Sequence, residues 1–122
     1  MIGYVTLGTN DLPAAAKFYD ALLAEIGATR FMEDDKFIAW ETKPGTPSLA
    51  ATQAFDGSPA TVGNGVMVAL VVENTSQVDA LHAKALALGA TDEGAPGPRS
   101  DSFYAGYFRD LDGNKLNFFC IV

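Results

Sequence analysis

Apolar positions recur along the first half of the chain with a strand-like period, then a helical period, then a strand-like period again. Residues 2–7 predict a short strand. A helix follows, capped by a side chain within residues 9–11 and ended by Gly27. The apolar residues of this helix recur at helical spacing: Leu12, Ala15, Tyr19, Leu22 and Ile26. Three further strands are predicted at residues 28–32, 36–42 and 48–53.

The second half repeats this order of patterns. Residues 66–72 predict a buried strand, followed by a helix that is capped by Thr75 or Ser76 and ended by Gly89. Residues 94–98 are rich in glycine and proline and predict a loop. The apolar face of the helix is expected to consist of Val78, Leu81, Ala85 and Leu88. The last two strands are predicted at residues 102–109 and 115–121.

The two halves form an internal repeat. The helix-ending glycines, Gly27 and Gly89, are 62 residues apart, and the repeat sets Tyr4 and Met67 on equivalent strands. Each half is expected to be a βαβββ module, which gives an α+β fold. One such module leaves a face of its sheet uncovered, so the two modules are expected to pair and curve around a shared cleft. The predicted organisation is a single domain over residues 1–122, with modules at 1–54 and 65–122 and a linker at 55–64.

Several short motifs support this organisation by their order and spacing. They are YVTLG at residues 4–8, DL at 11–12, FY at 18–19, GVM at 65–67 and DLDGN at 110–114. Together they resemble the vicinal oxygen chelate (VOC) family of glyoxalase, bleomycin-resistance and extradiol-dioxygenase proteins, over essentially the whole chain. The resemblance implies two βαβββ modules whose mixed sheet curls into a U-shaped cleft, and a homodimer.

The resemblance also implies positions at which enzymes of the family hold a divalent metal with His, Glu or Gln. Those positions fall on Tyr4, Met67 and Asn117, and a further one falls on Ala50 or Ala51. A phenol, a thioether, a neutral amide and a methyl group do not suit the hard or borderline ions that such enzymes use. We therefore expect no metal and no other cofactor.

Strand alternation predicts which side chains line the cleft. With residues 112–113 as a two-residue turn, Phe108 would lie opposite Asn117, whereas a register shift of one residue would turn Tyr107 and Arg109 inward instead. The lining is expected to be apolar and aromatic with a few polar groups, as in many small-molecule sites. The predicted ligand-contacting residues are Tyr4, Thr6, Trp40, Met67, Ala69, Tyr104, Phe108, Asn117 and Phe119.

Composition narrows the function classes. The net charge is -7, and the eight Lys and Arg residues form no basic stripe, which argues against nucleic-acid binding and suits a cationic ligand. The single cysteine, Cys120, is expected to be a packed thiol, in keeping with a reducing compartment. The sequence has no signal-peptide pattern and no membrane-spanning stretch, so a cytoplasmic protein is expected.

Two functions follow from these observations, and a purely structural or regulatory dimer is kept as a third alternative. The first is metal-free binding of a small aromatic or cationic molecule in the cleft. The second is a glyoxalase-like lyase or isomerase, or a dioxygenase-type enzyme, with a displaced metal or with Tyr4 as general acid and Asn117 orienting a substrate carbonyl. The base of such an enzyme would have to be Glu41 or Asp101. The only histidine, His82, is expected on a helix surface, and no Ser-His-Asp grouping can be assembled.

Overall fold

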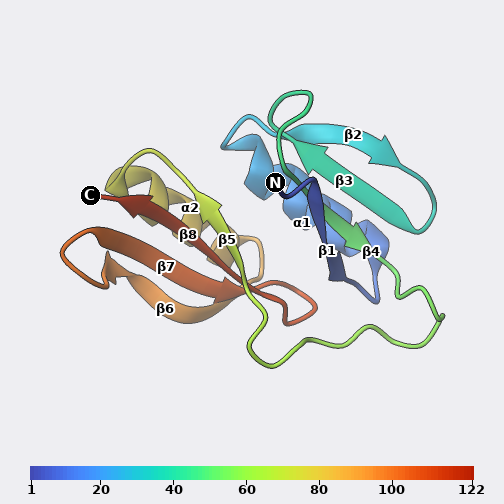
Figure 1. Cartoon of the computed structure of the whole chain (residues 1–122). Helices are drawn as coiled ribbons and strands as arrows, with labels where there is room; N and C mark the ends of the chain where they lie inside the picture. Colours follow the sequence, from blue (N-terminus) through green and yellow to red (C-terminus); the bar gives the residue numbers. More distant parts are fainter. The chain divides into compact units, whose positions relative to one another are not determined.

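Each half of the chain forms its own four-stranded sheet with one helix on it, as the computed structural model of residues 1–122 shows (Figure 1). The two units are Met1–Val62 and Gly63–Val122. The predicted tandem βαβββ modules are thereby confirmed. The curvature of the two sheets around a shared cleft, and the single domain, stay predictions. No helix is long and apolar enough to span a membrane.

The first unit has a mixed sheet in the order β1-β4-β3-β2, in which β1 runs parallel to β4. Asp11 caps the helix by accepting a hydrogen bond from the Ala14 amide, and Pro13 lies in the first turn, where a missing N–H costs nothing. Gly27 adopts the left-handed conformation that ends the helix. The elements are β1 (Tyr4–Gly8), α1 (Leu12–Ala24), β2 (Thr29–Glu33), β3 (Phe37–Glu41) and β4 (Ser48–Thr52).

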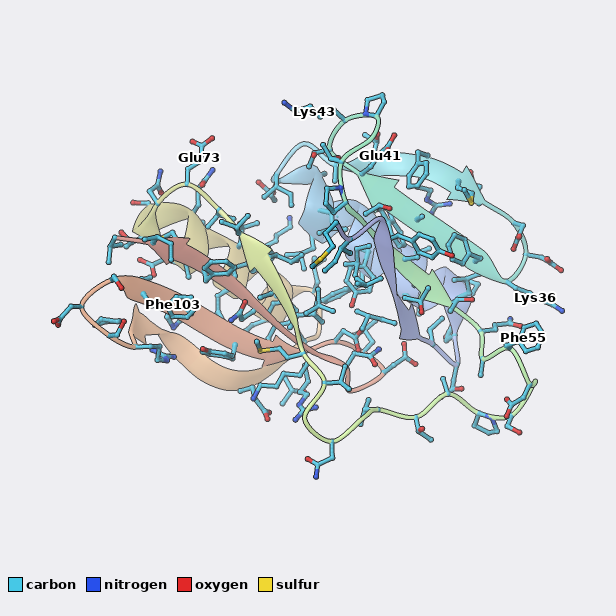
Figure 2. The ribbon with its side chains drawn as sticks, in the orientation of Figure 1. Lys36, Glu41, Lys43, Phe55, Glu73 and Phe103 are labelled. Carbon is cyan, nitrogen blue, oxygen red and sulfur yellow. The ribbon has the colours of Figure 1, made fainter.

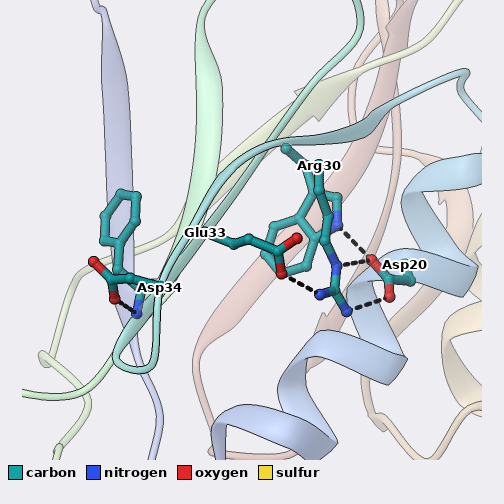
Figure 3. Close-up of polar contacts among 6 residues, drawn as sticks. Asp20, Arg30, Glu33 and Asp34 are labelled. Atoms are coloured by element: carbon teal, nitrogen blue, oxygen red, sulfur yellow. Dashed lines mark hydrogen bonds and ion pairs between the residues drawn. The ribbon is translucent and has the colours of Figure 1, made fainter.

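The core of the first unit lies between α1 and one face of this sheet. Trp40 is 2% exposed, and its indole Nε1 donates to the Asp20 carboxylate at 2.8 Å. Asp20 also accepts from Arg30, which in turn donates to Glu33, as Figure 3 shows. The hydrogen bond from Arg30 lowers the pKa of Asp20. This network connects the C-terminal half of α1 to β2 and β3.

The second unit has the matching order β5-β8-β7-β6, with β5 parallel to β8. Its helix is capped by Asn74, whose side chain accepts from the Gln77 amide, one residue before the predicted cap. The left-handed Gly89 follows its end. The elements are β5 (Val68–Val71), α2 (Thr75–Ala87), β6 (Thr91–Pro98), β7 (Phe103–Arg109) and β8 (Lys115–Ile121).

Alternation along β8 divides the second unit into a buried and an open side. Leu116, Phe118 and Cys120 are fully buried on the side that carries α2, and Phe108 of β7 stacks on Phe118. The expectation that Cys120 is a packed thiol is confirmed. Lys115, Asn117 and Phe119 therefore point to the opposite side.

His82 is 4% exposed, so its prediction as a helix-surface residue is wrong. Its ring packs over Gly106, where a Cβ would approach the ring at 3.1 Å. Its Nε2 lies 3.1 Å from both the Asp92 carboxylate and the Tyr107 carbonyl oxygen. The absence of a side chain at Gly106 makes this space, which the pattern of α2 alone does not reveal.

Two predictions in the second unit need correction. Residues 94–98 belong to strand β6 and not to a loop; β6 is an edge strand with two register irregularities, and edge strands tolerate proline and glycine at such places. The turn between β7 and β8 is also longer than predicted, because Arg109 pairs with Lys115 and leaves five residues, 110–114, between them. The Asp110 carboxylate accepts from the Asp112 and Asn114 amides and so closes this longer loop.

Candidate functional site

The sheets of the two units have the same register at their centres. In the first unit, Ala50 pairs with Thr6 on one side and Ala39 on the other. In the second unit, Asn117 pairs with Ala69 and Tyr107. Thr6 and Ala69 are 63 residues apart, the offset that relates Tyr4 to Met67. We call the three residues of the second unit, Ala69, Asn117 and Tyr107, the central row.

Asn117 is the unusual member of the central row. It is 1% exposed, and neither its Oδ1 nor its Nδ2 has a hydrogen-bond partner. Buried polar side chains nearly always have one, and an unsatisfied buried group costs about 1–3 kcal/mol. The side chain can accept through its oxygen and donate two hydrogen bonds through its nitrogen. An unsatisfied buried amide of this kind is a candidate for completion by a ligand or by an ordered water.

Positive charges flank Tyr107, although the chain as a whole is acidic. The Arg99 guanidinium lies 5.3 Å and the Lys115 ammonium 5.5 Å from the centroid of the Tyr107 ring. The carbonyl oxygens of Ala95 and Gly97 hold Arg99 in place. Lys115 forms no ion pair within 4.0 Å, so its charge stays available at the edge of the central row.

Beside these residues, Arg109 is neutralised. Its Nη2 donates to the Glu93 carboxylate at 3.1 Å, and this hydrogen bond lowers the pKa of Glu93. Its Nη1 donates to the Gly113 carbonyl in the turn before β8. We therefore regard Arg109 as a residue that anchors the turn between β7 and β8 and not as a ligand contact.

The structure corrects the predicted register of this face. Tyr107, and not Phe108, lies opposite Asn117, because the turn has five residues. Phe108 is buried beneath α2, and Tyr104 lies on the same side, since its hydroxyl donates to Asp79 of α2 at 2.7 Å. That hydrogen bond raises the pKa of Tyr104. The alternative register considered from the sequence had already indicated Tyr107.

Other predicted residues lie as follows. Phe119 is on the open side of β8, and its ring stacks on that of Phe103 with 5.1 Å between the ring centroids. Phe103 is labelled in Figure 2. Ala69 lies opposite Asn117, and Met67 directly precedes β5 and is partly exposed. From the sequence, Arg99 was not placed beside Tyr107, because the strand-like nature of β6 was not recognised. Lys115 was missed, although alternation along the predicted last strand puts it on the side of Asn117.

In the first unit, Tyr4 and Thr6 lie on the side of the sheet that turns away from α1. Tyr4 is 62% exposed, and its ring meets Phe37 edge-on at 6.3 Å. Glu41 lies on this side by alternation along β3. Trp40 lies on the other side, beneath α1, and is part of the core. Its prediction as one of the ligand-contacting residues that line the cleft is therefore wrong.

A cavity of about 750 Å³ opens in the first unit, at the end of the sheet where Figure 2 shows Lys36 and Phe55. Thr6, Gly8 and Thr52 form its floor. Residues 55–57 and 59–61 also line it, and they belong to the segment that the sequence predicted to be a linker. The segment is clamped by Asn10, which accepts from the Ala60 amide at 2.7 Å and donates to its carbonyl at 3.1 Å. Gly8 is the residue in the sequence that marks this close approach of the segment to the sheet, because a Cβ at Gly8 would lie 2.8 Å from Ala60.

The residues at the implied metal positions do not fit a divalent metal. Tyr4, Ala50, Met67 and Asn117 offer a phenol, a methyl group, a thioether and an amide, with no carboxylate or imidazole among them. No group of three or more His, Cys, Asp or Glu side chains lies close enough to hold an ion elsewhere.

Comparisons with known proteins agree with this architecture. The model of the Glyoxalase/Bleomycin resistance protein/Dioxygenase superfamily matches residues 1–118. The crystal structure of a glyoxalase/bleomycin resistance protein from Albidiferax ferrireducens T118 is 36% identical, covers 98% of both chains and has a TM-score of 0.89. A family enzyme from Burkholderia phytofirmans PsJN is 20% identical over 98% of both chains, with a TM-score of 0.79. Lactoylglutathione lyase from Agrobacterium tumefaciens is 21% identical, with 98% of this chain and 92% of that chain covered and a TM-score of 0.70. The two latter likenesses show the fold alone. The search of curated proteins gave no match.

Proposed function

Because the chain belongs to the Glyoxalase/Bleomycin resistance protein/Dioxygenase superfamily, we propose that it binds a small aromatic or cationic molecule without a metal. The observation that carries this proposal is Asn117. At a position where the family resemblance implies a metal-binding carboxylate, the chain has a buried neutral amide with no partner. An amide there is suited to hydrogen bonding with an organic ligand and poorly suited to holding a divalent cation.

Exposed or half-buried aromatic rings support an aromatic ligand. The first unit offers Tyr4 and Phe37, and the second offers Phe119 with Phe103. Rings with accessible faces or edges stack on a planar ligand and contribute about 0.5–1.5 kcal/mol per pair beyond the area that they bury. A cationic group would find its best surroundings in the first unit, where Glu41 lies on the side of Tyr4 and Phe37.

We further propose that the protein is a cytoplasmic homodimer. The family resemblance motivates the dimer, and exposed apolar side chains such as Phe31 and Met32 on the edge strand β2 support it. The unpaired Cys120 thiol suits a reducing compartment. Sedimentation of the untagged protein over a range of concentrations tests the dimer, and a monomer at every concentration would contradict it.

The metal-free part of the proposal is tested by measuring metals in the purified, untagged protein by mass spectrometry. The same sample is then melted with added Ni, Zn, Mn, Fe or Co. We expect no stoichiometric metal and no rise in melting temperature, since the donor set offers no anionic ligand. Bound metal, or a rise of several degrees with one ion, would overturn metal-free binding and support an isomerase or dioxygenase with a displaced metal.

The ligand is then sought by NMR with small aromatic and cationic compounds. NMR is preferable to fluorescence here, because the only tryptophan, Trp40, is buried beneath α1 and reports on the core. Resonances on the open side of either sheet should shift, whereas those of α1 and α2 should not. If no compound in such a set shifts any resonance, the small-molecule function is contradicted.

A further inference from the structure

We propose that the central row recognises a planar carboxamide or lactam edge, a group that presents a hydrogen-bond donor and an acceptor side by side. This inference rests on the proposed function and names the chemical class of its ligand. Asn117 contributes the complementary pair, Ala69 borders it with a single methyl group, and Tyr107 lies on its other side.

The hydrogen-bonding needs of Asn117 select this class. Both Oδ1 and Nδ2 are unsatisfied in the same buried side chain, so a ligand must donate to one and accept from the other to satisfy both. A carboxylate only accepts and would leave Oδ1 unpaired. An amidinium or ammonium only donates and would leave Nδ2 unpaired. An amide edge satisfies both atoms with two parallel hydrogen bonds.

The charges around the central row support the same choice. Arg99 and Lys115 lie over the ring of Tyr107, directly opposite Asn117 in the sheet. Two positive charges beside the residue that pairs with Asn117 oppose a cationic group there. A neutral amide is not repelled by these charges, and its carbonyl dipole can be oriented toward them. A cationic group elsewhere on the same ligand is not affected by this restriction.

The first unit provides an internal comparison for this site. Its equivalent positions carry Thr6, Ala50 and Ala39, and none of these offers both a donor and an acceptor that are buried and unsatisfied. The recognition of an amide edge is therefore assigned to the second unit alone.

Three probes of nearly identical shape separate the possibilities: benzamide, benzoate and benzamidinium. Each is titrated into isotope-labelled protein, and the side-chain NH₂ resonances of Asn117 are followed by NMR. We expect benzamide to bind most tightly and to shift both NH₂ resonances. Tighter binding of benzoate would show that Arg99 and Lys115 dominate, and tighter binding of benzamidinium would show a cation site; either result overturns the inference.

Variants of Asn117 test whether the amide is responsible. In N117L, which keeps the branched shape, the affinity for benzamide should fall about tenfold, as expected for the loss of one to two ordinary hydrogen bonds. The affinity for benzoate, which can accept only from Nδ2, should fall less than the affinity for benzamide. N117A, which copies the residue of the first unit, is the second variant should the leucine disturb packing. N64A, which removes an exposed amide from the segment before β5, is the matched control and should bind benzamide normally.

The outcomes distinguish this inference from the proposed function. If the three probes bind equally and N117L has no effect, aromatic binding stands and recognition of an amide edge is refuted. If no probe binds but the wider set of compounds yields a ligand, the inference fails and the function again stands. If neither the probes nor the wider set binds, both fail.

Discussion

The open sides of the two sheets have the same backbone pairing but different side chains. The first unit places Thr6, Ala50 and Ala39 in the row where the second places Ala69, Asn117 and Tyr107. The row of the first unit has small side chains and almost no polar groups. The other has a buried amide next to a ring that is flanked by two cations. The comparison teaches that an internal repeat can preserve its backbone geometry while only one copy carries a buried amide without a hydrogen-bond partner.

The largest change in stability is expected for β7, because one side of this strand faces α2 and the other side is open. F108A should destabilise the protein by about 3–5 kcal/mol, since it removes a fully buried ring that stacks on Phe118. Y107A changes the neighbouring residue, which lies on the open side, and should lower the free energy of unfolding much less. Denaturant unfolding of both variants measures this. Equal losses would contradict the observed register of β7 and β8.

The next effect comes from placing the amide of the second unit into the first. A50N should destabilise the protein by about 2–4 kcal/mol, because Ala50 is fully buried and the new side chain brings both extra volume and unsatisfied polar atoms. A50V, which adds volume without polar atoms, is the matched control. The melting temperature of A50N should fall below that of A50V. If the two are equal, volume alone explains the loss, and the cost assigned to an unpaired amide is wrong.

The converse change in the second unit should stabilise the protein. In N117L, two unsatisfied buried atoms are replaced by apolar ones, and we expect a gain of about 1–2 kcal/mol in the free energy of unfolding. Stability is measured in denaturant without ligand, alongside the loss of benzamide binding. A gain in stability with a loss of binding would identify a residue kept for function. A loss of stability would indicate that Asn117 contributes to packing.

The smallest effect concerns acid stability in the first unit. Because Arg30 lowers the pKa of Asp20 in the folded state, the ionised carboxylate stabilises the protein above the unfolded pKa, and this contribution is lost as the pH falls through the folded pKa. The pair is partly exposed to solvent, so we expect the contribution to be about 1 kcal/mol or less. D20N should therefore lose less stability than the parent protein between neutral pH and the acid range. Unfolding curves at a series of pH values measure this, with D56N, an exposed carboxylate, as control.

Much of the architecture was readable from the sequence because local signals agreed with the tertiary structure. Both helices begin beside an Asp or Asn that caps them and end next to a left-handed glycine, Gly27 or Gly89. The equal spacing of these glycines revealed the repeat. The place of Asn117 on the open side followed from alternation once the last strand had been recognised.

The remaining features depend on contacts between residues that are distant in the sequence or on loop geometry. Asp110 closes a five-residue turn, so a plausible Asp-Gly turn gave the wrong register, and Tyr107 replaced Phe108 in the central row. His82 is buried because Gly106, on another element, leaves room for its ring. Trp40 belongs to the core because Asp20 of α1 accepts its N–H. None of these partners can be identified from the pattern around the residue itself.

The strand order also has a consequence for how the chain is made. In each unit the last strand, β4 or β8, lies in the interior of the sheet and separates the first strand from the others. During synthesis, β1 has no neighbour to pair with until β4 has left the ribosome, and β5 must wait in the same way for β8. Each sheet is therefore complete only when its last strand, which is an interior one, has been synthesised. Until then the nascent unit exposes unpaired strand edges.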